Sequence, residues 1–154
     1  MHICVLIVAL EAGAVVSPPQ VAYDHYFDAA TFAIEAQANA DTVAYWLVMT
    51  YDEGSISVPQ GSTLTIHLRD RSTLVLATDR EVGRRDVTLR RWRNRSIHYI
   101  TCRYPITQQQ LARILDKDVY RLEIETARGT ITRQVRRIKE KLTSALATLT
   151  LKGG

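Results

Sequence analysis

The sequence lacks the short motifs that mark well-known catalytic and nucleotide-binding sites. It contains no G-x-S-x-G nucleophile elbow, no P-loop, no H-E-x-x-H zinc motif and no C-x-x-C pair. No two of its four histidines lie four residues apart. No catalytic residue, metal site or cofactor is therefore predicted, and a hydrolase with an unrecognised site is the weakest of the functional hypotheses.

Long apolar runs and cysteines are also scarce. No run of about 18 or more apolar residues occurs, so no transmembrane helix is predicted. The two cysteines, Cys4 and Cys102, have no partners at metal-ligand spacing, and the sequence leaves open whether they form a disulfide. We expect Cys102 to be a core residue, because free cysteine behaves as a small apolar side chain. With 154 residues, the chain has the length of one domain with its own core.

Basic residues are absent from the first part of the chain. No Lys or Arg precedes Arg69, whereas seven acids do, so residues 1–68 carry a formal charge of −7. Residues 69–154 carry all 20 bases and the other nine acids, which gives +11 and leaves the whole chain at +4. Such a division indicates a polyanion-binding half. It fits equally a fold in which the acidic and basic parts pack against each other.

The basic part includes an arginine-rich segment between residues 80 and 95, which holds seven arginines and one tryptophan. Guanidinium groups bind phosphates and carboxylates, and an indole stacks on a base or on a guanidinium. The segment therefore suggests polyanion or nucleic-acid binding, without an accompanying RRM, KH, helix-turn-helix or zinc-finger pattern. The alternative is a solvated loop and strand edge whose charges oppose aggregation. The predicted polyanion-binding residues are Arg84, Arg85, Arg90, Arg91, Trp92, Arg93 and Arg95.

The amino-terminal stretch has two interpretations. Residues 3–10 are almost wholly apolar, and Ala12 and Ala14 form a small-x-small site, as in a short secretory signal peptide. Two features count against a signal: no Lys or Arg precedes the apolar run, and an acid lies next to the cleavage site. A continuous apolar run of this length also suits a buried first strand. Residues 1–20 are therefore predicted to be a signal peptide or the first strand, and residues 21–154 a single α+β domain.

The carboxy-terminal third has the clearest pattern of secondary structure. Thr107 and Gln110 have the spacing of a capping box, so a helix is predicted to start at Gln108. Residues 119–126 and 130–135 alternate between apolar and polar side chains around a glycine turn. This alternation predicts a β-hairpin with one buried face.

A second, longer helix is predicted over residues 136–149, because apolar residues recur along one stripe of this segment. Arg136 and Arg137 fall at its amino end, where the helix dipole disfavours cations. Their placement indicates either a role in ligand binding or an ordinary solvated pair.

Acidic and basic side chains share the predicted hairpin. Glu123 and Glu125 form a carboxylate pair, which glycosidases use when two carboxyl groups face a substrate in a cleft. The exposed face of a hairpin, with Arg121 and Arg133 nearby, explains the pair more simply. We expect Arg133 to lie across from one of the two glutamates.

The middle of the chain predicts further strands. Residues 43–51 are partly apolar on both faces, so this strand is placed centrally in the sheet. Residues 32–38 alternate with a period of two, which suggests a strand, although their alanines also suit a helix. Residues 63–78 indicate a hairpin around the polar loop 69–72. His67 falls on the polar face of that hairpin, where we expect it to be exposed.

Four segments carry a resemblance to a known family. The sequence VPQGSTLTIHL (58–68) is similar to a kinked glycine turn followed by a strand, and RSTLVLAT (71–78) to the returning strand. The sequence HYITCRYPITQQQLARIL (98–115) is similar to a strand ending in aromatic-Pro-Ile-Ser/Thr before a Gln-Leu helix, and VYRLEIETARGTITRQV (119–135) to a strand, glycine turn and strand. In this order the segments resemble a family of small uncharacterised exported proteins of the Bacteroidetes, over residues 57–149. The resemblance implies this fold and an export signal, but no activity.

These patterns predict an α+β domain with a mainly antiparallel sheet of about six to eight strands, a short helix after Thr107 and a carboxy-terminal helix packed on one face. The function predicted first is a non-enzymatic exported or envelope-associated binding or structural domain. The alternative is a polyanion or nucleic-acid binder that uses residues 84–95. The location is the periplasm or cell envelope if residues 1–14 are a signal, and the cytoplasm otherwise. The partner stays open: a polyanion and a second copy of the chain are both compatible with the sequence.

Overall fold

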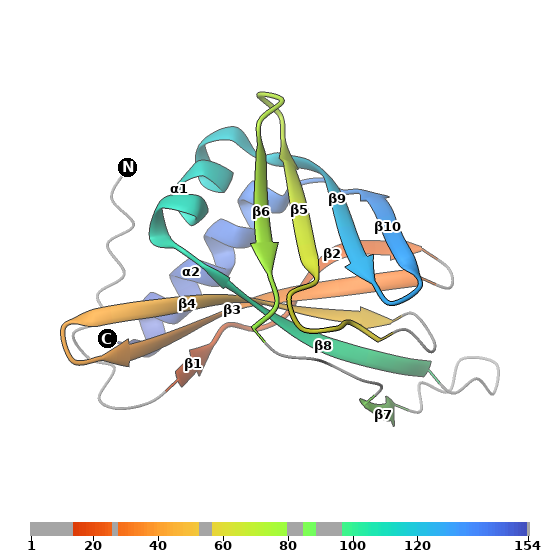
Figure 1. Ribbon diagram of the computed structural model, residues 1–154. Helices are drawn as coiled ribbons and strands as arrows, with labels where there is room; N and C mark the ends of the chain where they lie inside the picture. Colours follow the sequence, from red (N-terminus) through yellow and green to blue (C-terminus); the bar gives the residue numbers. More distant parts are fainter. Residues whose placement is uncertain (1–13, 26–27, 53–56, 80–84, 89–96, 154) are drawn as a thin grey trace.

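Two antiparallel sheets and two helices form the fold (Figure 1). The computed structural model describes residues 14–25, 28–52, 57–79, 85–88 and 97–153. It describes the backbone alone at residues 25, 28, 39, 52, 85–88, 97–99 and 150–153. The predicted α+β class, with mainly antiparallel strands, one short helix and a carboxy-terminal helix, is confirmed.

The larger sheet has six strands in the order β1-β3-β4-β8-β7, with β2 paired to the same strand as β1. Both β1 and β2 pair with β3, so together they form one edge of the sheet. Strand β4 pairs with β3 on one side and with β8 on the other, which confirms the predicted central strand. The six strands are β1 (Ala14–Val16), β2 (Gln20–His25), β3 (Asp28–Asn39), β4 (Thr42–Asp52), β7 (Arg85–Thr88) and β8 (Ile97–Ile106).

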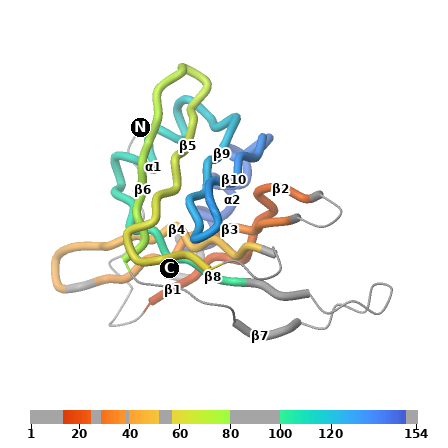
Figure 2. The backbone as a smooth tube through the Cα atoms, turned by 45° about the vertical axis from the view of Figure 1, so that its right-hand side comes forward, coloured from red at the N-terminus to blue at the C-terminus, as the bar shows by residue number. Residues whose placement is uncertain are grey.

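The smaller sheet has four strands in the order β10-β9-β5-β6. Both of its hairpins, β5–β6 and β9–β10, are those predicted from the sequence. The strands of the two sheets run across one another, and the small sheet stands on one side of the large one (Figures 1 and 2). The prediction of a single sheet with about six to eight strands therefore differs from the structure, in which β5 bonds to β9 and to no strand of the large sheet. The four strands are β5 (Thr63–Leu68), β6 (Thr73–Ala77), β9 (Val119–Thr126) and β10 (Gly129–Gln134).

The predicted position of Arg133 across from a glutamate is wrong. The turn between β9 and β10 places Gly129 opposite Thr126, and this register puts Arg133 opposite Leu122. Because a hairpin turn fixes every pair that follows it, Thr132 and not Arg133 lies opposite Glu123. The Arg133 guanidinium lies instead 5.8 Å from the ring centre of Tyr23 on β2.

Helix α1 (Gln108–Lys117) begins where the sequence predicts. The Thr107 hydroxyl accepts a hydrogen bond from the Gln110 N–H at 3.1 Å, and the Gln110 side chain accepts one from the Thr107 N–H at 2.9 Å. This reciprocal pair satisfies two backbone donors that a helix start would otherwise leave unbonded. The buried face of α1 consists of Leu111, Ile114 and Leu115.

Helix α2 (Ile138–Gly153) starts two residues later than predicted. Arg137 has a left-handed backbone with φ of 61°, which a continuous α-helix does not allow. The first helical turn is instead capped from outside, because the N–H of Lys139 donates to Asp118 Oδ1 at 3.0 Å. Within the described ranges, no helix has the length and apolar character that crossing a membrane requires.

The inner faces of both sheets and one face of each helix share a single core. Alternate residues of β5 are buried, as are the facing residues of β4 and β8. Leu142 and Leu146 of α2 and Leu122 and Ile124 of β9 are all buried in this core, as the apolar stripes predict. The apolar run at residues 3–10 lies outside the described residues, and the first described strand begins at Ala14.

Candidate functional site

The predicted polyanion-binding residues fall almost wholly outside the described residues. Arg85 is the exception, and only in its backbone: it begins β7, the last strand of the large sheet, and pairs with Tyr99 of β8. The hypothesis of polyanion binding through this segment therefore stays a prediction. The residues outside the described ranges are Arg84, Arg90, Arg91, Trp92, Arg93 and Arg95.

A histidine, an arginine and a glutamate form a cluster on the outer face of the small sheet. Arg121 Nη2 lies 3.4 Å from His67 Nδ1, and Glu123 Oε1 lies 3.2 Å from His67 Nε2, although not along the direction of a good hydrogen bond. Because a guanidinium can only donate, Nδ1 accepts, and a neutral ring carries its proton on the nitrogen that faces Glu123. Both ring nitrogens thus face side chains of the protein. With 15% of its side chain exposed, His67 is not the exposed histidine that the sequence predicts.

The second glutamate of the predicted carboxylate pair is engaged as well. Glu125 Oε2 accepts hydrogen bonds from the Thr63 N–H and from the Thr63 hydroxyl, both at 2.9 Å. These two donors, the backbone one first, lower the pKa of Glu125 below its ordinary value. The interpretation of Glu123 and Glu125 as ordinary members of a hairpin face agrees with these contacts.

A salt bridge and a stacking contact join three strands on the outer face of the large sheet. Arg103 of β8 donates through Nε to Glu35 of β3 at 2.9 Å, and its Nη2 contacts the same carboxylate oxygen. The Arg103 guanidinium also lies 4.6 Å from the ring centre of Trp46 on β4. An arginine held by a carboxylate and an indole at once fixes these strands side by side, which is a structural role.

Two tyrosines and a cysteine form a buried polar cluster between β4 and β8. The hydroxyl groups of Tyr51 and Tyr104 lie 3.1 Å apart, and both side chains are buried. Burial raises the pKa of Tyr51 and of Tyr104 well above the ordinary tyrosine value, and raises that of Cys102 to about 12. Cys102 is fully buried and has no disulfide, as expected for a core residue. At neutral pH all three groups are protonated, so the thiol is a poor nucleophile.

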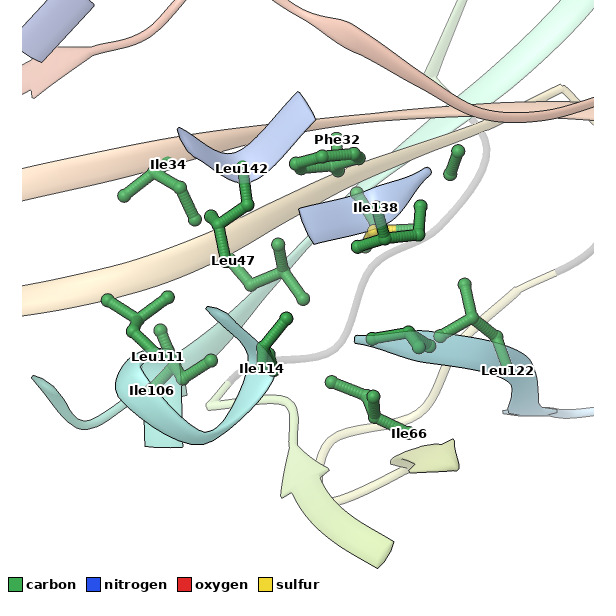
Figure 3. Close-up of a pocket in the computed structure, with 13 residues that line it drawn as sticks. Phe32, Ile34, Leu47, Ile66, Ile106, Leu111, Ile114, Leu122, Ile138 and Leu142 are labelled. Carbon is green, nitrogen blue, oxygen red and sulfur yellow. The ribbon is translucent and has the colours of Figure 1, made fainter. Parts of the chain in front are cut away.

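The interior holds a small apolar cavity where the two sheets meet the helices (Figure 3). It leaves about 30 Å³ for water-sized molecules, and every residue that lines it is apolar and buried. Water gains no hydrogen bonds in such a space, so the cavity suits only a very small apolar molecule. The side chains that point toward it include Phe32, Leu47, Ile66, Leu111, Ile114, Leu122, Ile138 and Leu142.

A larger, open groove lies between β2 and the junction of β10 with α2, and we call it the β2 groove. It has a volume of about 370 Å³. Lys141 Nζ donates to the Val21 carbonyl at 2.6 Å, and Arg136 is exposed, without a partner in the described part of the chain. The groove therefore combines cationic and apolar surface. Its lining residues are Val21, Ala22, Tyr23, Asp24, Gln134, Val135, Arg136 and Lys141.

A second open groove, of about 450 Å³, lies beside β4, the end of β8 and the start of α1. No cationic residue lines it, and its Thr107 is committed to the cap of α1. Elsewhere in the described ranges, no three His, Cys, Asp or Glu side chains lie close enough to hold a metal ion. Of these two grooves, the β2 groove is therefore the one lined by cations as well as by apolar side chains. The only sequence signal toward it was the placement of Arg136 next to a helix start.

No family model matches the chain, and no curated protein or solved structure is significantly similar to it. The resemblance to exported proteins of the Bacteroidetes therefore stays a prediction from the four sequence segments.

Proposed function

We propose that this protein is a non-enzymatic binding domain that is exported or held at the cell envelope, with the β2 groove as the place where it holds its partner. The observation that supports this most is a contrast between the groove and the other polar clusters. Arg136 lines the groove and is exposed, whereas the acids and the histidine on the outer sheet faces are engaged by neighbouring residues.

The composition of the β2 groove also supports binding. Ligand sites in proteins combine apolar walls with a few polar groups that fix orientation. Here exposed Val21 lies near two cations, and Tyr23 is held by the Arg133 guanidinium. The walls belong to β2, the end of β10 and α2, together with Val135 and Arg136 in the short connection between β10 and α2.

Export is supported by the sequence of the amino-terminal stretch. The apolar run at residues 3–10 and the small-x-small site at Ala12 and Ala14 suit a signal peptide. Cleavage after Ala14 would keep Val15 and Val16 of β1, which pair with β3. The resemblance to exported proteins points the same way.

The proposal is tested on the protein isolated from cells that make it naturally. Mass spectrometry of the intact chain is expected to find a mature amino terminus at Val15 in the envelope or periplasmic fraction. Native mass spectrometry is expected to find a bound species on the wild type and on the control R128Q, and to find its occupancy reduced in R136Q. A chain that starts at Met1 in the cytoplasm contradicts export, and equal occupancy of R136Q and wild type contradicts the groove as the binding site.

A second candidate function is polyanion binding through residues 84–95. It is favoured by the charge of +11 on residues 69–154 and by the six arginines of residues 84–95. Single-stranded nucleic acid or heparin is expected to bind at low salt and to dissociate steeply as salt rises. The triple variant R90Q/R91Q/R93Q is expected to lose this binding, and R136Q to keep it. Undetectable affinity at low ionic strength contradicts this function.

A further inference from the structure

We infer that the β2 groove binds a small organic anion, whose carboxylate or phosphate group lies against Arg136 and Lys141 and whose apolar part lies on Val21 and Val135. This inference rests on the proposed function, because it names the class of ligand for the same groove. It follows from the donors, the charge and the apolar surface of the groove.

The two cations have hydrogen-bond donors to spare. The Lys141 ammonium has three N–H donors and uses one on the Val21 carbonyl, so two remain for a ligand. That bond also holds the ammonium beside β2 in a fixed position. The Arg136 guanidinium has five donors, and none is used by the described residues. Carboxylates and phosphates are the groups that accept from such donors most strongly.

The charges that line the groove favour an anion. Two of them are positive, Arg136 and Lys141, and one is negative, Asp24. The neighbouring Arg137 does not add to the site, because its guanidinium is bound by Glu140 at 2.6 and 2.8 Å. With Asp24 on the strand side, the most positive part of the groove is on the side of α2, and the anionic group is assigned there.

The apolar surface makes the expected ligand organic and not a bare anion. Val21 has 46% of its surface exposed and is one of three described large apolar residues that are exposed. The other two, Val16 and Val75, do not line the groove. Each methylene that a ligand buries against such surface raises affinity roughly fourfold. A groove of about 370 Å³ has the size of a small-molecule site.

The test is a titration of the full ¹⁵N-labelled chain, followed by amide NMR, with five soluble probes. Hexyl phosphate and hexanoate are expected to shift the amides of residues 21–24 and 134–136. Inorganic phosphate and hexanol, which each lack one half of the ligand, are expected to bind at least roughly tenfold more weakly. Butyl phosphate, whose chain is shorter, is expected to bind more weakly than hexyl phosphate. Shifts that lie outside the groove, or hexanol binding as tightly as hexanoate, overturn the inference.

Variants separate the anion contact from folding. R136Q is expected to weaken the affinity for hexyl phosphate roughly two- to fivefold, as for the loss of a solvent-exposed ionic contact. R136K is expected to retain most of this affinity. R128Q, an exposed arginine on the β9–β10 turn, is expected to leave it unchanged. Equal weakening by R136Q and R128Q overturns the assignment of Arg136.

Anionic phospholipid vesicles distinguish a lipid headgroup from a free organic acid. If hexyl phosphate displaces the protein from the vesicles, the inference holds with a lipid as the source. If the vesicles are not bound while the soluble anions are, a free acid is the source. Binding to vesicles without any response to soluble anions overturns the inference.

If hexanol binds in the groove as tightly as hexanoate, the anionic class of the ligand is wrong while the proposed function stands. If no probe moves the groove amides and native mass spectrometry finds no bound species, both fail.

Discussion

Asp118 and Lys139, 21 residues apart in the chain, are joined by a hydrogen bond from the Lys139 N–H to Asp118 Oδ1. The same oxygen accepts from the Val119 N–H at 2.8 Å. The Asp118 N–H donates to Ile114 at the end of α1, and its carbonyl accepts from the N–H of Arg69. One residue thus ties together both helices, β9 and the β5–β6 loop. It does so with φ of 62° and ψ of 164°, a backbone region that favours glycine.

Two substitutions of Asp118 distinguish the stabilisation by its hydrogen bonds from the cost of its strained backbone. D118A loses the helix cap, which costs about 1–2 kcal/mol, and keeps the strained backbone. D118G loses the same cap but removes strain of about 1–3 kcal/mol. We therefore expect the free energy of unfolding in urea to fall in D118A and to be higher in D118G than in D118A. A D118A protein as stable as D118G would contradict the strain at this position.

The hydroxyl pair of Tyr51 and Tyr104 predicts an energetic coupling. Removing one hydroxyl leaves a buried partner without its hydrogen bond, which costs about 1–3 kcal/mol. Urea unfolding is expected to show a loss of stability in Y51F and in Y104F, and the double variant Y51F/Y104F to lose less than the two single losses added together. Simple additivity would show that the two hydroxyls do not interact.

The buried Cys102 thiol predicts that stability declines at alkaline pH. Burial raises its pKa from 9.0 to about 12 in the folded protein, so the folded state holds a proton that the unfolded state loses. Its contribution to stability is fully present below pH 9 and is lost as the pH rises from 9 toward 12. The raised tyrosine pKa values act in the same direction above pH 10. Urea unfolding between pH 8 and pH 11 is expected to show a decline that is shallower in C102A. An identical slope in C102A and wild type would remove the thiol as a cause.

The contribution of Glu125 to stability is expected to be lost at acid pH, whereas that of Cys102 is lost at alkaline pH. Its folded pKa lies below that of an unfolded glutamate, because the Thr63 N–H and hydroxyl donate to its carboxylate. Its contribution to stability is therefore present above the unfolded pKa and is lost as the pH falls through the folded pKa. NMR titration of the Glu125 carboxyl is expected to give a pKa below 4.5, and T63V to move it part of the way back. A value in T63V equal to that of the wild type would show that the hydroxyl has no part in the shift.

The features that the sequence predicted correctly depend on neighbours in the chain. The cap of α1 needs only Thr107 and Gln110, and the two hairpins need only their own alternation and turns. The features that it missed depend on residues far apart. Arg103 and Glu35 lie 68 positions apart, and no local pattern links them. The start of α2 was predicted too early because its cap comes from Asp118, outside the helix.

The two candidate sites differ in the same way, because one is a continuous segment of the sequence and the other is assembled from distant segments. The arginine-rich segment was conspicuous in composition, and its side chains lie outside the described residues. The β2 groove is assembled from residues 21–24 and 134–141, which no spacing rule connects, so only Arg136 at a helix start hinted at it. The division of strands into two sheets was missed for a related reason. Alternation fixes which face of a strand is buried, and it does not say which strand lies beside it.

The electrostatic account of the β2 groove is tested most directly by the signs of two substitutions, with affinity for hexyl phosphate measured by calorimetry at physiological salt. R136Q removes a positive charge from the groove and D24N a negative one, and D24N also keeps the size of the side chain. The account predicts opposite effects: R136Q weakens binding roughly two- to fivefold, and D24N strengthens it roughly twofold. Affinities that move in the same direction, or that do not move at all, would contradict the groove as an anion site.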